Sequence, residues 1–197
     1  MKTNAHATSQ NKEQQKKASF SCAFSPDMKR RTNDSNEKKK AAERSRKVAS
    51  ILEAIEKWNS VVCEGKSVIA QILALKKESE GNRDLNEELQ DQCQMLRDIS
   101  IQFTSLSREI EAVKINSLDE SKNGSFIGQD ELAKSHEVIA RKLRDQSALM
   151  VDVAENIGST ESLDKAVCFA CIWTFQPELD DDYFLALKWI NSTFCDG

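Results

Sequence analysis

Residues 48–76 read VASILEAIEKWNSVVCEGKSVIAQILALK, and their apolar positions recur at alternating steps of three and four. Residues 85–113 read LNEELQDQCQMLRDISIQFTSLSREIEAV and keep the same rhythm, with one polar interruption at Gln92. This spacing lets an α-helix lay one apolar seam against a partner helix. The turn-prone residues 79–82, Ser-Glu-Gly-Asn, separate the two stretches, so together they predict an antiparallel helical hairpin resembling a coiled coil.

The two predicted helices differ in the residues that flank their seams. The first helix carries further apolar residues beside the seam, namely Leu52, Ala54, Val61, Val68, Leu73 and Leu75. Such a wide stripe predicts contact with more than one neighbour. The flanks of the second helix are mostly polar or small, so we expect it to lie more peripherally.

Helical periodicity continues after a predicted loop over residues 119–128. A third helix is expected from Leu132 to Ile157, with Gly158 as a left-handed cap and Ser159 or Thr160 capping the next helix. A fourth, Leu163 to Phe175, is apolar nearly all round and is followed by Pro177, which ends it. A short last helix is expected over residues 182–194. With 6 Gly and 2 Pro in 197 residues, the composition also favours an all-α fold.

The first 40 residues form a basic segment, which we expect to be a disordered tail preceding a helical domain of residues 41–197. They hold ten Lys or Arg against four acids, so the tail carries +6 and the remainder −10. An acidic body argues against nucleic-acid binding except through the tail. No apolar run is long enough to be a membrane span or a secretion signal, so we expect a soluble, non-secreted protein with reduced cysteines.

Two features of the tail suggest function. Lys16 and Lys17, followed after eleven residues by Lys29, Arg30 and Arg31, have the spacing of a two-part nuclear import signal. A solvated basic tail is the alternative, and the sequence leaves both open. Ser25 precedes Pro26 and is therefore a minimal phosphorylation site for a proline-directed kinase.

Three motifs could carry chemistry, and each has a simpler interpretation. Residues 64–67, Glu-Gly-Lys-Ser, resemble the end of a phosphate-binding loop but lack its first glycine and the preceding strand. Cys168 and Cys171 form a Cys-x-x-Cys that could be redox-active or half of a zinc site, although small buried thiols are favoured. His136 lies on an apolar seam, where a hydrogen-bonded core or boundary residue is expected. We therefore expect no catalytic residue, no metal site, no cofactor and no enzymatic activity.

Three groups of residues together resemble the cyclin-dependent kinase 2-interacting protein family. They are Trp58, the run Asn86, Glu87, Glu88 and Leu89 with Cys93 and Leu96, and residues 170–178, Ala-Cys-Ile-Trp-Thr-Phe-Gln-Pro-Glu. The likeness covers residues 55–180, and its most specific element is Trp173 followed by Gln176 and Pro177. It implies a non-enzymatic nuclear adaptor that contacts cell-cycle kinases at replication origins and acts in checkpoint signalling. It further implies membership of a chromatin-associated AAA+ ATPase assembly and a link to maturation of the large ribosomal subunit.

Partner binding is expected on residues 163–177, because a helix apolar on every side leaves apolar area over after packing. Trp58 and Trp173 could be anchors or core residues. The full set of candidate partner-binding residues is Trp58, Asn86, Glu87, Glu88, Phe169, Trp173, Gln176 and Pro177. Two alternatives remain open: a homodimeric coiled-coil scaffold that pairs the second helix with its own copy, and a nucleic-acid tether acting through the tail.

Overall fold

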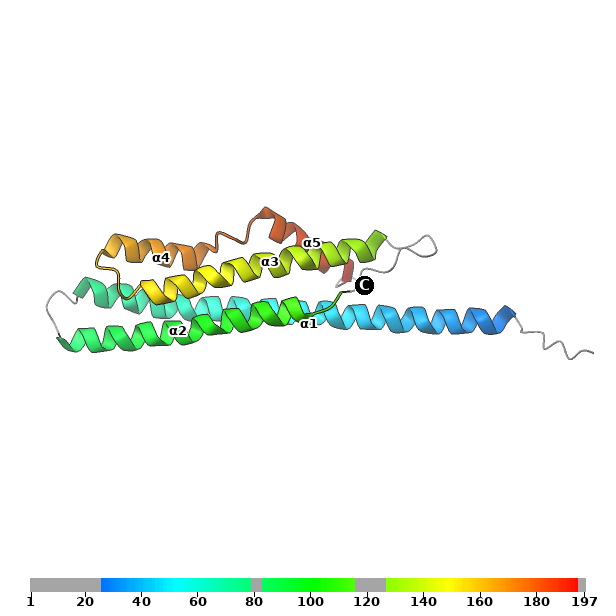
Figure 1. Ribbon diagram of the computed structural model, residues 1–197, viewed down its shortest axis with the longest axis horizontal. Coiled ribbons are helices and arrows are strands. Elements are labelled where there is room, and N and C mark those ends of the chain that lie inside the picture. Colours follow the sequence, from blue (N-terminus) through cyan, green and yellow to red (C-terminus); the bar gives the residue numbers. More distant parts are fainter. Residues whose placement is uncertain (1–25, 79–82, 116–126, 195–197) are drawn as a thin grey trace, which may run out of the picture. The chain divides into compact units, whose positions relative to one another are not determined.

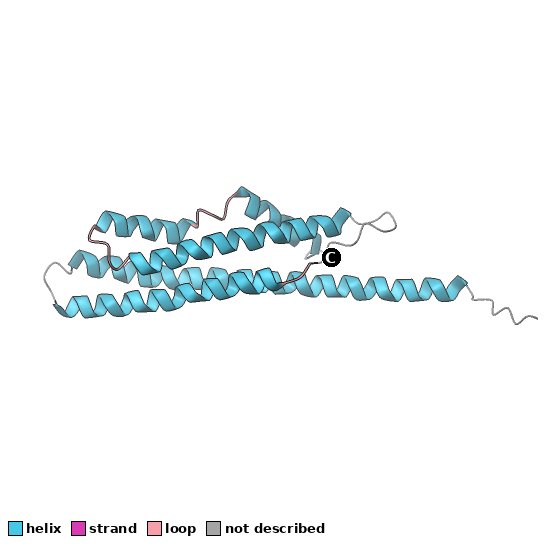
Figure 2. Ribbon diagram, in the orientation of Figure 1, coloured by secondary structure: helices cyan, strands magenta, loops and turns pink. Residues whose placement is uncertain are grey.

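The computed structural model describes residues 26–78, 83–115 and 127–194. These residues form helices and short connections, without a strand (Figure 1, Figure 2). The helices are α1 (Pro26–Glu78), α2 (Arg83–Ala112), α3 (Ile127–Asn156), α4 (Leu163–Phe175) and α5 (Asp181–Phe194). The predicted all-α fold, with a long hairpin, a third long helix and short C-terminal helices, is therefore confirmed.

The chain divides into residues 1–40 and residues 41–197. In the first unit α1 already begins at Pro26, which corrects the expectation of disorder over residues 26–40. Residues 37–46 read EKKKAAERSR and consist almost entirely of strong helix formers. A helix that is already nucleated extends at little cost, so the segment stays helical although it shows no apolar periodicity. The expectation of disorder for residues 1–25 lies outside the described residues.

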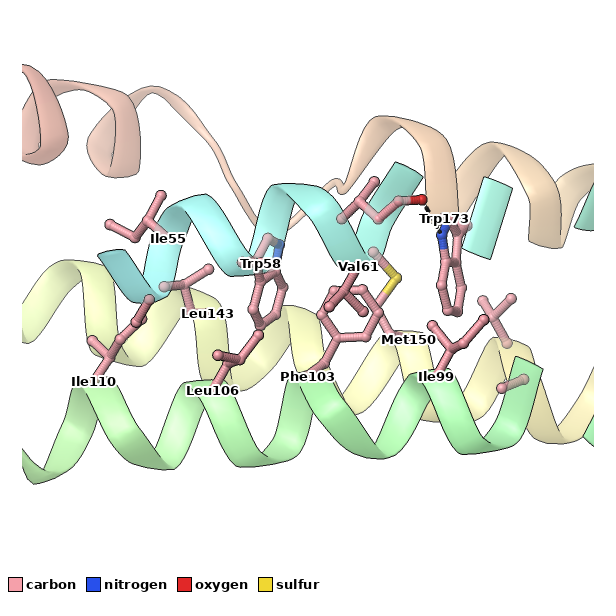
Figure 3. Packing of buried hydrophobic residues seen from close by; sticks show 14 of the residues in the cluster. Ile55, Trp58, Val61, Ile99, Phe103, Leu106, Ile110, Leu143, Met150 and Trp173 are labelled. Atoms are coloured by element: carbon pink, nitrogen blue, oxygen red, sulfur yellow. Dashed lines mark hydrogen bonds between the residues drawn. The ribbon is translucent and has the colours of Figure 1, made fainter. Parts of the chain in front are cut away.

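In the second unit α2 runs back along α1, and α3 packs against α2, α4 and α5 (Figure 1). Figure 3 shows the centre of this core, where side chains of α1, α2, α3 and α4 meet. As its width predicted, the apolar stripe of α1 is buried on more than one side. The buried hydrophobic residues in the described part of α1 are Val48, Ile51, Ala54, Ile55, Trp58, Val61, Val62, Val68, Ile69, Ile72 and Leu75.

Helix α2 is less peripheral than its polar flanks suggested. Its apolar seam is buried within the chain, at Leu96, Ile99, Phe103, Leu106 and Ile110. Its small flanking residues Ser100 and Ser107 are also buried, and the Thr104 hydroxyl lies 3.3 Å from that of Ser147 on α3. Small side chains therefore allow α3 to pack closely there. The residues through which α2 would pair with its own copy are thus covered within the chain.

The end of α3 differs in detail from the prediction. Gly158 does not adopt the left-handed conformation; a Cβ atom there would lie 2.5 Å from the sulfur of Cys93, so the glycine provides space. Neither Ser159 nor Thr160 caps α4. Its N-cap is Ser162, with φ −87° and ψ 124° and no hydrogen bond from the side chain. The C-terminal boundary of α4, before Pro177, is as predicted.

Candidate functional site

The side chain of Trp173 packs α4 against the middle of α1. Its side chain is fully buried, and its indole Nε1 donates a hydrogen bond to the carbonyl oxygen of Val62 at 3.1 Å. The ring occupies the space beside Gly65, where a Cβ atom would lie 2.5 Å from Cε2 and closer still to Cζ2. Gly65 thus lies within a helix and accommodates an aromatic ring, which leaves no basis for a phosphate-binding loop at residues 64–67.

Trp58 is the corresponding aromatic residue of α1, and it is 1% exposed. Its indole Nε1 donates to Oε1 of Gln176 at 2.7 Å. Phe103 on α2 contacts both indoles edge to face, with ring centroids 4.5 Å from Trp58 and 5.3 Å from Trp173 (Figure 3). Edge-to-face pairs of this kind stabilise a core beyond the area they bury. Trp58 and Trp173 are therefore core residues, and this corrects their interpretation as anchors for a partner.

Gln176 and the residues after it form a turn that the core holds from two sides. Gln176 caps α4 in the left-handed conformation, with φ 48° and ψ 68°, and its backbone N–H donates to the Ile172 carbonyl at 3.0 Å. The backbone N–H of Glu178 donates to Oε1 of Gln146 at 3.0 Å, and Gln146 is fully buried on α3. Gln146 was not among the candidate residues of the sequence analysis, although it lies within the third predicted helix. A polar residue at a buried seam position was the signal, because such groups are almost always hydrogen-bonded.

Helix α4 buries only one of its faces. Ala166 and Trp173 point into the core and Phe169 is half-buried, whereas Leu163, Val167 and Phe175 are 41%, 45% and 76% exposed. We call the exposed residues Leu163, Val167, Cys168, Cys171 and Phe175 the outer face of α4. Cys168 and Cys171 are free and exposed, so the prediction that they are small buried thiols is wrong. On α5, Phe184 and Leu185 are 57% and 64% exposed as well.

The other candidate residues are not brought to the outer face of α4 by any described contact. Glu87 and Glu88 are exposed on α2, and Pro177 is exposed after α4. The side chain of Asn86 is not among those described. Lys29, Arg30 and Arg31 fall within α1 without described side chains, and Lys16, Lys17 and Ser25 lie outside the described residues.

Polar side chains close the ends of several helices. His136 lies with Nε2 2.8 Å from the Ile110 carbonyl in the last turn of α2, as expected for a boundary histidine. Lys76 donates from Nζ to the carbonyl oxygens of Gly158 at 2.8 Å and Thr160 at 2.7 Å. Burial lowers the pKa of Lys76 and raises that of the Cys93 thiol nearby. His136 and Lys76 thus contact backbone carbonyl oxygens at or just beyond the ends of helices, which is a structural role.

Two further titratable groups surround the turn into α5. The hydrogen bond from Lys142 holds the pKa of Asp180 below its usual value, and the Asp180 carboxylate also accepts from the backbone N–H of Tyr183 at 3.4 Å. Burial raises the pKa of Tyr183 to about 12. The pair of Lys142 and Asp180 joins α3 to the residue that precedes α5.

Within the described ranges, no three or more His, Cys, Asp or Glu side chains are grouped so that they could hold a metal ion. None of the described helices is long and apolar enough to cross a membrane. A scan against models of protein families and a search of curated proteins found no match to this chain. The candidate site is therefore the outer face of α4.

Proposed function

We propose that this protein is a non-enzymatic adaptor that binds protein partners through the outer face of α4. The observation that carries the proposal is the exposure of Leu163, Val167 and Phe175 on a single short helix. Exposed apolar side chains grouped on one element are typical of protein interaction sites, whereas isolated ones are ordinary. Aromatic side chains such as Phe175 supply much of the binding energy at such sites.

The resemblance to the cyclin-dependent kinase 2-interacting protein family supplies the identity of the proposed partners. On this proposal the adaptor is nuclear and links cell-cycle and replication-origin kinases to checkpoint signalling and to a chromatin-associated AAA+ ATPase assembly. A contribution to maturation of the large ribosomal subunit belongs to the same proposal. The motif behind the resemblance, Trp173 with Gln176 and Pro177, supports it by fixing α4 with its outer face exposed.

The test is affinity capture from nuclear extract with variants that leave the core intact. Substitution of Trp173 would not separate binding from folding, because that side chain is fully buried. The double variant V167S/F175S changes only exposed residues, and I101S on α2 is the matched control because Ile101 is 64% exposed outside α4. We expect recovery of AAA+ ATPase subunits or cell-cycle kinases by the wild type and I101S, with a loss of tenfold or more for V167S/F175S. Equal recovery by all three proteins would exclude this face.

A nucleic-acid tether is the second candidate function. It is favoured by Lys38, Lys39 and Lys40, which lie exposed in the helical part of the basic segment. Phosphate contacts made by such residues weaken steeply with salt. DNA or RNA binding that is salt-sensitive and disappears on deletion of residues 1–40 would support the tether, and binding unaffected by the deletion would exclude it.

A further inference from the structure

Cys168 and Cys171 are free and exposed on the same turn of α4. Their exposure removes the interpretation as buried hydrophobic residues, which was the main argument against a function for this pair. A zinc site would need further ligands, and the part of the chain that the structure describes has no cluster of three or more suitable side chains. Thiol–disulfide exchange is the remaining use of a Cys-x-x-Cys motif.

We propose that Cys168 and Cys171 form a dithiol site that low-molecular-weight disulfides such as glutathione disulfide oxidise reversibly to an intramolecular disulfide. Residues i and i+3 of an α-helix have Cα atoms about 5 Å apart, within the range of about 4.4–6.8 Å that disulfides span. This modification depends on the two thiols alone and does not rest on the proposed partner binding.

The helix must tighten locally when the bond forms. Cβ atoms at positions i and i+3 lie about 5–6 Å apart, whereas a disulfide holds them at about 3.5–4.5 Å. Tightening toward a 3₁₀ turn, in which side chains at i and i+3 eclipse, brings them together. Because this distortion raises the energy of the oxidised form, the bond is reduced more easily than a relaxed disulfide, and the modification is reversible.

The reaction consists of two exchange steps. The thiolate of one cysteine attacks a sulfur of glutathione disulfide, which forms a mixed disulfide and releases one glutathione thiolate. The thiolate of the other cysteine then attacks the protein sulfur of the mixed disulfide and releases the second glutathione. The protein loses two protons and two electrons, and glutathione disulfide takes them up to become two molecules of reduced glutathione.

Cys63 provides a control within the same chain. It is free and exposed on α1, and neither residue three positions away from it, Ser60 or Lys66, is a cysteine. Cys63 should therefore stop at the mixed disulfide, whereas the pair on α4 proceeds to the second step. The tryptic peptide of residues 166–188 contains Cys168 and Cys171 and no other cysteine, and the peptide of residues 58–66 contains Cys63 alone.

The experiment treats the reduced full-length protein with glutathione disulfide, traps remaining thiols with N-ethylmaleimide, and maps tryptic peptides by mass spectrometry without reduction. We expect peptide 166–188 to lose two hydrogens and to carry no glutathione, while peptide 58–66 carries one glutathione. The variants C168S and C171S should each retain a glutathione adduct on the remaining thiol. Excess reduced glutathione should return the wild-type pair to two thiols.

Three results would overturn the proposal. Peptide 166–188 could carry two glutathiones, which would mean that the second exchange does not occur. It could stay unmodified while Cys63 reacts, which would mean that the pair is inert. Finally, it could be cross-linked to another peptide, which would mean that the disulfide is not formed between Cys168 and Cys171.

Discussion

Replacement of Gly65 by alanine tests whether the indole of Trp173 determines how α4 docks on α1. At an ordinary position inside a helix, this replacement is favourable by about 1 kcal/mol. At Gly65 the added Cβ atom would lie 2.8 Å from Nε1 and 2.5 Å from Cε2 of the indole, closer than real Cβ contacts. Overpacking of this kind costs about 1–3 kcal/mol. Displacement of the ring also breaks its hydrogen bond to Val62, and an unpaired buried donor costs about 1–3 kcal/mol.

The three terms together give an expected net loss for G65A of about 1–5 kcal/mol in the free energy of unfolding. Urea denaturation followed by circular dichroism measures it. The matched control is S67A, two residues along the same helix and exposed, which should be neutral or slightly stabilising. In a W173L background the clash is absent, so G65A should cost much less or become favourable. A stability of G65A equal to or above that of the wild type would refute the proposed packing.

Three further predictions use the same denaturation assay. G158A should cost about 1–3 kcal/mol because its methyl group meets the sulfur of Cys93, and a C93A background should recover most of the loss. Q176A and Q176G both remove the acceptor of Trp58, but Q176G should be the more stable by about 1 kcal/mol because φ is 48°, so equal stabilities would argue against a left-handed cap. Burial raises the pKa of Tyr183 from 10.0 to about 12, so its contribution is fully present below pH 10 and is lost as pH rises toward 12. Compared with Y183F, the wild type should lose about 2–3 kcal/mol more over that interval, and parallel pH profiles would contradict the assigned burial.

The fold could be predicted from the sequence where a periodic pattern met a strong boundary signal. Helix α4 has the predicted bounds, because its apolar run is followed by Pro177 and the residue before a proline avoids the helical region. The spacing of apolar residues in α2 also predicted which side of that helix is buried, because a single apolar stripe at helical spacing defines a single buried face. The start of α1 was missed because residues 26–40 are helical without any apolar periodicity to detect.

The candidate site could be predicted only in part. Helix α4 is apolar on nearly every side, so its sequence shows no separate polar and apolar faces from which the buried face could be deduced. Periodicity therefore could not separate Trp173, which is buried, from Phe175, which is 76% exposed. It could not place the thiols of Cys168 and Cys171 either. The prediction for Gly158 was wrong for a related reason. A glycine after a helix can either adopt the left-handed conformation or make room for a close neighbour, and only the position of Cys93 shows that the second role applies.

The residues behind the family resemblance and those proposed to bind partners have different roles. Trp58, Trp173 and Gln176 are joined by hydrogen bonds and ring contacts inside one core, so their pattern specifies how α4 docks. Val167 and Phe175 are exposed on the opposite face of α4 and do not contribute to the docking of this helix. A chain could therefore keep the motif and the fold while its outer face changed, or lose a partner without losing stability. For this reason the identity of the partners must be tested with substitutions on the outer face of α4, where binding can fail while the core stays intact.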